Sequence, residues 1–94
     1  MKFDYNIIWY DIAEKKLLNQ VSYILEKSQN LLIAEQFYDA IKSEVDKLSY
    51  TADVYTLRKR KEISILNGKY QVKFLIGVEN VYIVDFKSAR QNAY

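Results

Sequence analysis

Side chains able to bind an anion gather in the second half of this 94-residue chain. The last 41 residues carry eight Lys and Arg against three acids, whereas the first 53 carry six Lys against nine acids. Cations in such a cluster bind phosphates or carboxylates and release counterions. The sequence therefore predicts contact with an acidic partner or a nucleic acid, with protection of a strand edge as the alternative. The residues expected to make this contact are Arg58, Arg60, Lys61, Lys69, Lys73 and Arg90.

Acid–base and metal chemistry have few candidate residues in this sequence. The chain has no histidine and no cysteine, which removes the commonest general base, the commonest transition-metal ligand and any disulfide. A catalytic site would have to use Lys, Arg, Tyr, Glu or Asp. We expect neither a metal nor a cofactor.

The first half of the chain is expected to form a strand and a helical hairpin. Residues 2–9 alternate with period two, which is typical of a strand. Helical spacing of apolar residues predicts helices over 12–27 and 31–48. Asp11 and Glu14 have the spacing of a capping box, and Asn30 or Ser28 can cap the second helix. The apolar stripes are Leu18, Val21, Ile24 and Leu25 in the first helix, and Ile33, Phe37, Ala40, Ile41, Val45 and Leu48 in the second.

The second half is expected to form three strands. Residues 54–57 and 63–66 are rich in β-formers and, with the cationic run 58–61 between them, make up the first of the three. Asn67-Gly68 is a strong hairpin signal between 63–66 and 70–76, and 81–86 forms the last strand. The predicted fold is a single α+β domain over 1–94, in the order β-α-α-β-β-β. An antiparallel sheet carries the N-terminal helical hairpin on one face.

A membrane or secreted location is not indicated. No apolar run approaches the roughly 18 residues that span a bilayer. Residues 1–10 lack the basic region and the cleavage site of a signal peptide. We expect a cytoplasmic protein that makes no contact with a membrane.

Three strings of the sequence, together with its length and element order, are similar to one family. They are Trp9-Tyr10-Asp11-Ile12-Ala13, Leu66-Asn67-Gly68-Lys69-Tyr70-Gln71-Val72-Lys73-Phe74, and Val81-Tyr82-Ile83-Val84-Asp85-Phe86 leading to Ala89-Arg90-Gln91-Asn92. They resemble the RelE/ParE superfamily of toxins from type II toxin–antitoxin modules, and the resemblance covers essentially the whole chain.

The resemblance implies a growth inhibitor, of the kind linked to plasmid stabilisation, that a cognate antitoxin binds and neutralises. RelE-type members cleave messenger RNA in the ribosomal A site, and ParE-type members poison DNA gyrase. A third alternative is an inactive relative that only binds its partner. If the protein is an enzyme, the resemblance implies a metal-independent endoribonuclease.

Several positions that carry catalysis in RelE-type members differ in this chain. The Tyr-Arg pair at the start of the central strand is Tyr70-Gln71, and the lysines of the preceding strand align with Glu62 and Ser64. A histidine found near the end of some members aligns with Ser88. These departures slightly favour a ParE-like gyrase poison.

Two residues near the end of the chain remain as catalytic candidates if the protein is a ribonuclease. Arg90 matches the C-terminal arginine of the family, and Tyr94 ends the chain as a catalytic tyrosine does in some relatives. Arg90 either stabilises a phosphate or simply anchors the last strand, and both interpretations stay open.

Overall fold

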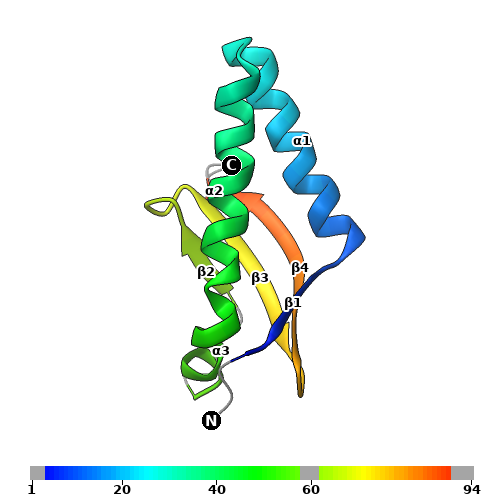
Figure 1. The fold of residues 1–94 in the computed structure, drawn as a ribbon, viewed down its shortest axis with the longest axis vertical. Helices are drawn as coiled ribbons and strands as arrows, with labels where there is room; N and C mark the ends of the chain where they lie inside the picture. The colour runs from blue at the N-terminus through cyan, green and yellow to red at the C-terminus, as the bar shows by residue number, and fades with distance from the viewer. Residues whose placement is uncertain (1–3, 58–61, 90–94) are drawn as a thin grey trace.

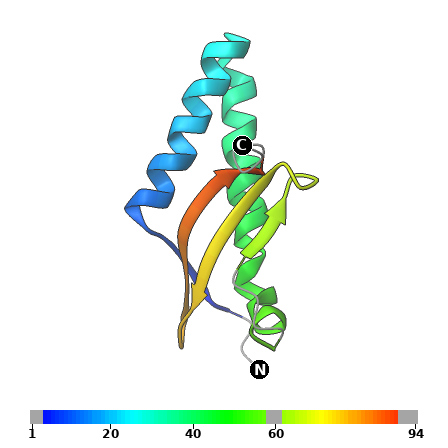
Figure 2. The ribbon, with the colours of Figure 1, turned by 180° about the vertical axis from the view of Figure 1, so that it is seen from behind.

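The computed structural model describes residues 4–57 and 62–89, and it contains a helical hairpin on one side of a four-stranded sheet (Figure 1). The predicted α+β class and the position of the helices before the last three strands are confirmed. Seen from behind, no described element covers the other face of the sheet (Figure 2). The elements are β1 (Asn6–Trp9), α1 (Asp11–Ser28), α2 (Leu31–Asp46), α3 (Leu48–Leu57), β2 (Glu62–Ile65), β3 (Tyr70–Ile76) and β4 (Asn80–Ser88).

The sheet has the strand order β1-β4-β3-β2 and is mixed. β3 is antiparallel to β2 and β4, as predicted, but β1 is parallel to β4, with Asn6 opposite Asn80 and Trp9 opposite Ile83. A parallel pair needs a long connection, and the segment between β1 and β4 supplies it. Strand alternation has the same period in either direction, so the sequence pattern could not reveal this pairing.

The predicted strand over residues 54–57 is wrong, because these residues end the helix α3. Leu48 and Ala52 lie one helical turn apart, and both are buried in the core. The ring of Tyr55 meets that of Phe74 edge-on, with centroids 5.8 Å apart. Burial of this helical face outweighs the local β propensity of the segment. The predicted second helix therefore divides into α2 and α3 at Lys47.

The start of α1 differs from the predicted capping box. Tyr10 occupies the N-cap position without a side-chain cap, and Asp11 is already helical. Glu14 instead accepts hydrogen bonds from the Tyr38 hydroxyl at 3.0 Å and from Lys42 Nζ at 2.7 Å. The carboxylate of Glu14 thus joins the two helices of the hairpin.

The predicted stripe of α1 is confirmed only in part, since Val21 packs half-buried against the core but the fully buried positions differ. Ala13 and Leu17 are fully buried, whereas Leu18 is 46% exposed. The predicted cap of α2 is confirmed, since the Asn30 side chain accepts hydrogen bonds from the backbone N–H groups of Leu32 and Ile33.

The core forms where α1, α2 and α3 meet the sheet. Its fully buried aliphatic and aromatic side chains include Leu17, Ile41, Val45, Leu48, Val72, Phe74, Val81 and Ile83. Within residues 4–57 and 62–89, no helix is both long enough and apolar enough to cross a membrane.

Candidate functional site

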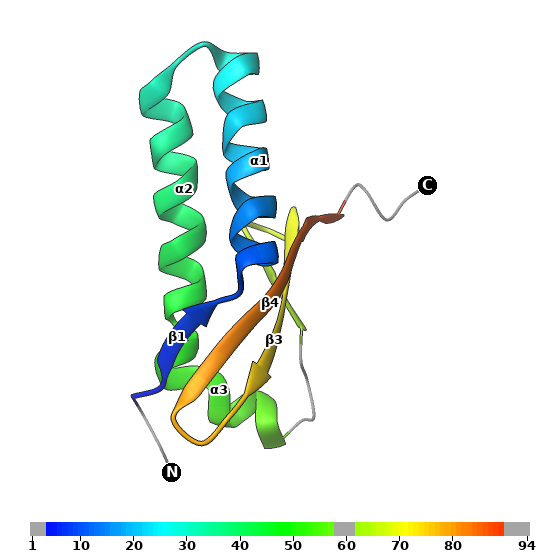
Figure 3. The same cartoon turned by 90° about the vertical axis from the view of Figure 1, so that its right-hand side faces the viewer.

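A groove of about 1030 Å³ lies between α1 and the adjoining ends of β3 and β4, which stand side by side in Figure 3. We call it the basic groove, because three lysines line it and no Asp or Glu does. Its lining residues are Lys16, Asn19, Gln20, Tyr23, Ile24, Asn67, Gly68, Lys69, Tyr70, Phe86, Lys87, Ser88 and Ala89.

The turn between β2 and β3 positions Lys69 at this groove. Asn67 and Gly68 have φ values of 59° and 80°, so the predicted Asn-Gly turn is present, with Leu66 also left-handed at 50°. Nothing lies within 4 Å of a Cβ built on Gly68, so its positive φ is the reason that glycine fits there. The Ala89 N–H donates to the Lys69 carbonyl at 2.9 Å, which fixes the turn against the end of β4.

Tyr70 forms a rigid part of the groove wall. Its ring stacks on Phe86 with centroids 5.4 Å apart, and it meets Phe37 of α2 edge-on at 5.2 Å. Its hydroxyl accepts a hydrogen bond from Gln20 Nε2 at 3.2 Å. The hydroxyl proton remains available to a ligand, while the ring packs against Phe86 and Phe37. Tyr23 is 53% exposed, and Lys27 Nζ lies 5.7 Å from the centroid of its ring, so an exposed ring stands beside a cation here.

The three lysines of the basic groove differ in their pairing. Lys16 Nζ forms an ion pair of 2.6 Å with Asp85. Burial alone would raise the pKa of Asp85, but the hydrogen bond and charge of Lys16, aided by Lys73, lower it below the ordinary value. Lys69 and Lys87 form no ion pair with any described residue. They are therefore the cations with charge to offer an incoming anion.

The arrangement suits anion binding better than acid–base chemistry. The lining holds ammonium, amide and phenol donors, and it contains no carboxylate that could accept a proton. Across the described residues, no group of His, Cys, Asp and Glu side chains is placed to hold a metal ion.

The predicted contact residues do not all lie in one place. Lys69 lines the basic groove, whereas the exposed Lys73 sits between the buried Val72 and Phe74, so it points to the uncovered face of the sheet, as expected. Its register neighbours there are Asp85 and Glu62. The other predicted residues, Arg58, Arg60, Lys61, Arg90 and Tyr94, lie outside the described residues.

Three of the four positions that differ from RelE-type members lie on the uncovered face of the sheet, whereas the fourth, Ser88, lies opposite Tyr70 and lines the basic groove. Ser64 lies opposite Gln71, and Glu62 lies opposite Lys73 on the neighbouring strand. Residues directly opposite each other share a face of the sheet. On this face Lys73 therefore lies between Glu62 and Asp85, and Gln71 lies between Ser64 and Lys87.

Two lysines of the basic groove were missed by the sequence prediction. Lys16 belongs to the more acidic half of the chain, and Lys87 was counted only as part of the general charge. Their signal is visible only after α1 is placed against β4, because residues about seventy positions apart then share one wall.

No protein-family model matches this chain, and no curated protein matches it either. Its functional assignment therefore rests on the fold and on the residues of the basic groove.

Proposed function

We propose that this protein is the cytoplasmic toxin component of a type II toxin–antitoxin module and that it inhibits growth when its antitoxin is absent. The observation that carries the proposal is the basic groove, built by a helical hairpin against the last strands of a small α+β domain. Lys69 and Lys87 line it without an acidic neighbour in the lining. Such a groove suits an acidic segment of a cognate antitoxin.

A ParE-like action on DNA gyrase is the favoured activity. Metal-free RNA cleavage requires groups that move protons and stabilise an extra phosphate charge. Glu62, Ser64 and Gln71 replace cations on one face of the sheet, and a carboxylate at that place repels phosphate. The alternative is a RelE-like ribosome-dependent endoribonuclease, for which Arg90 and Tyr94 are the candidate catalytic residues. The other alternative is an inactive relative that binds only its partner.

The test is induction of this chain alone in a bacterial host, followed by incorporation of labelled thymidine and methionine over the first minutes. Arrest of DNA synthesis first, with gyrase cleavage complexes formed by the purified protein, is expected. Arrest of translation first, with messenger RNA cut at A-site codons, would replace gyrase by the ribosome as the target. Undiminished growth at high expression would overturn the toxin assignment.

A further inference from the structure

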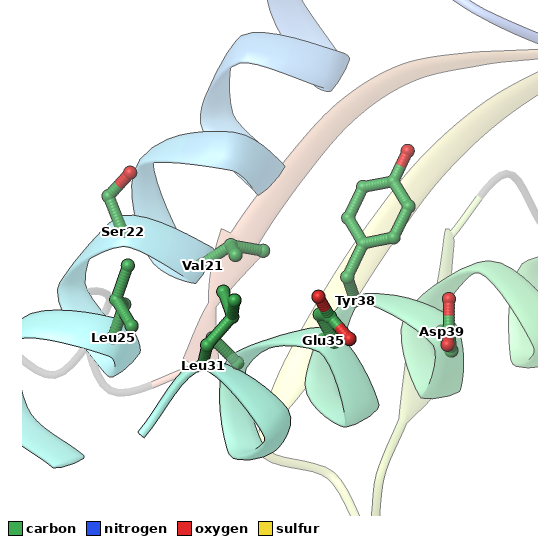
Figure 4. Close-up of a pocket in the computed structure, with 8 residues that line it drawn as sticks. Val21, Ser22, Leu25, Leu31, Glu35, Tyr38 and Asp39 are labelled. Carbon is green, nitrogen blue, oxygen red and sulfur yellow. The ribbon is translucent and has the colours of Figure 1, made fainter. Parts of the chain in front are cut away.

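A second hollow, of about 390 Å³, lies between α1 and α2 where the helical hairpin extends beyond the sheet (Figures 3 and 4). We call it the interhelical hollow. Figure 4 shows side chains from both helices around it. Its lining residues are Val21, Ser22, Leu25, Leu31, Ala34, Glu35, Tyr38 and Asp39.

The apolar side chains at this end of the hairpin are unusually exposed. Leu31 and Leu32 are 61% and 60% exposed, and Leu25 and Ile33 are 38% and 45% exposed. Three consecutive aliphatic residues open α2, and no described element packs over them (Figure 1). Exposed apolar runs of this kind cost solubility, and they commonly mark an interaction surface.

The acidic side chains that line the interhelical hollow make it negatively charged. Glu35 and Asp39 lie one helical turn apart on α2, and neither forms an ion pair with a described residue. Like charges at this spacing destabilise an isolated helix. No Lys or Arg lines the hollow. A ligand that brings cations to Glu35 and Asp39 would relieve this repulsion, so the hollow is complementary to a basic partner.

The shape of the hollow favours a helix as that partner. Two antiparallel helices leave a groove between them that accepts the ridge of a third helix. A single aliphatic side chain of such a helix can enter between Leu25 and Leu31. Lysines or arginines one turn away on the same helix then reach the two carboxylates. This is the helix-in-groove mode of recognition.

We propose that the interhelical hollow binds a basic amphipathic helix of a partner protein, with apolar contacts to Leu25 and Leu31 and ion pairs to Glu35 and Asp39. This basic helix is opposite in charge to the acidic partner proposed for the basic groove. The proposal therefore stands independently of the toxin assignment.

The test uses the full chain and a fluorescent 18-residue helical peptide of leucine and lysine, with leucines at i, i+3, i+4 and i+7 spacing. A second peptide has every lysine replaced by glutamate. Fluorescence anisotropy is expected to show at least tenfold tighter binding of the lysine peptide. Amide shift changes in the labelled protein should fall on residues 21–39 and spare residues 67–70.

Matched variants separate a specific site from general charge attraction. Glu35→Gln with Asp39→Asn should weaken binding of the lysine peptide at least tenfold, and Leu31→Ser should weaken it similarly. The control, Glu62→Gln with Asp46→Asn, removes the same charge from exposed positions away from the hollow and should change affinity less than twofold. Circular dichroism should show an unchanged fold for all of these exposed substitutions.

Three outcomes would overturn the proposal. Equal affinity for the two peptides would remove the charge selectivity. Equal losses of affinity in the test and control double variants would show that the peptide is attracted only by the net charge of the protein. A dimer of the chain alone in sedimentation, dissociated by Leu31→Ser, would identify a second copy as the occupant of the hollow.

Discussion

The basic groove and the interhelical hollow share the helix α1 but differ in nearly everything else. Lys16 and Tyr23 face the groove, while Ser22 and Leu25 face the hollow. The groove joins residues that are distant in the sequence, and hydrogen bonds and ring contacts fix its wall. The hollow joins two consecutive helices and leaves apolar and acidic side chains exposed. One near-neutral chain thus presents two surfaces of opposite sign.

The charge asymmetry between the two halves of the chain therefore does not describe either surface. α1 belongs to the acidic half, yet it contributes Lys16 to the basic groove. Side chains return to the same face of an α-helix about every 3.6 residues, so different faces of one helix can bind partners of opposite charge.

Loss of the shared core should abolish both surfaces and give the largest effect. Phe74 is fully buried in β3, and Phe74→Ala should lower the free energy of unfolding by about 3–5 kcal/mol. Urea denaturation followed by circular dichroism measures the change. The neighbouring Leu75→Ala, at a 43% exposed position, should cost less than about 1 kcal/mol. A Phe74→Ala protein that keeps the interhelical hollow while its sheet is unfolded would show that the two surfaces fold independently.

Charge reversal in the basic groove should separate the two surfaces. Lys69→Glu with Lys87→Glu should weaken binding of a labelled 20-residue polyglutamate peptide by about ten- to a hundredfold, because the groove then repels the ligand. Anisotropy at several salt concentrations measures this loss. Lys15→Glu with Lys47→Glu, both outside the groove, is the matched control and should change affinity by less than threefold. Parallel loss of lysine-peptide binding in the groove variant would contradict separate surfaces.

Two substitutions at the tip of the helical hairpin should change the stability of the protein in opposite directions. Asn30→Ala removes the side-chain cap that accepts hydrogen bonds from the backbone N–H groups of Leu32 and Ile33. It should lower the free energy of unfolding by about 1 kcal/mol. Gln29 has a φ of 52°, so Gln29→Gly should stabilise the protein by up to about 1 kcal/mol. Thermal denaturation measures both changes. Affinity of the basic groove for polyglutamate should stay constant, and a matching loss there would couple the tip to the sheet.

The ion pair beside the groove should give the smallest effect, and one that depends on pH. Asp85→Asn should cost about 0.5 kcal/mol at pH 7, since Lys16 is 45% exposed and solvent screens the pair. The pKa of Asp85 is lowered in the folded protein, so its contribution is present above the ordinary value of 3.8. It is lost as the pH falls through the lowered value. Urea titrations at a series of pH values from 7 to well below 3.8 should show the difference between the proteins disappear once the carboxyl is protonated in the folded protein.

The features that the sequence predicted well depend on local chemistry. The Asn67-Gly68 turn needs left-handed backbone, and the Asn30 cap needs a short acceptor side chain. Both requirements act within four residues. The features that it missed depend on packing between distant elements. Residues 54–57 are helical because α3 packs on the core. β1 runs parallel to β4 because these two strands, far apart in the sequence, pair in the sheet.

The candidate site shows the same division. Lys69 was expected as a contact residue from its charge in the basic second half of the chain, whereas the places of Lys16 and Lys87 in the groove needed the placement of α1 against β4. The interhelical hollow was not predicted, because the expected stripes assigned Leu25 and Ile33 to the core. Contact by Arg58, Arg60, Lys61 and Arg90, and catalysis by Arg90 or Tyr94, stay predictions.

The parallel pairing of β1 with β4 has a consequence for synthesis on the ribosome. Asn6 and Asn80 are 74 positions apart, and they meet through both their backbones and their side chains. The nascent chain can form the helical hairpin early, since its contacts are local, but the first strand must wait for residues 80–83 to emerge. We therefore expect the interhelical hollow to form before the basic groove during translation. Pulsed hydrogen exchange during refolding should show amides of α1 and α2 protected before those of β1.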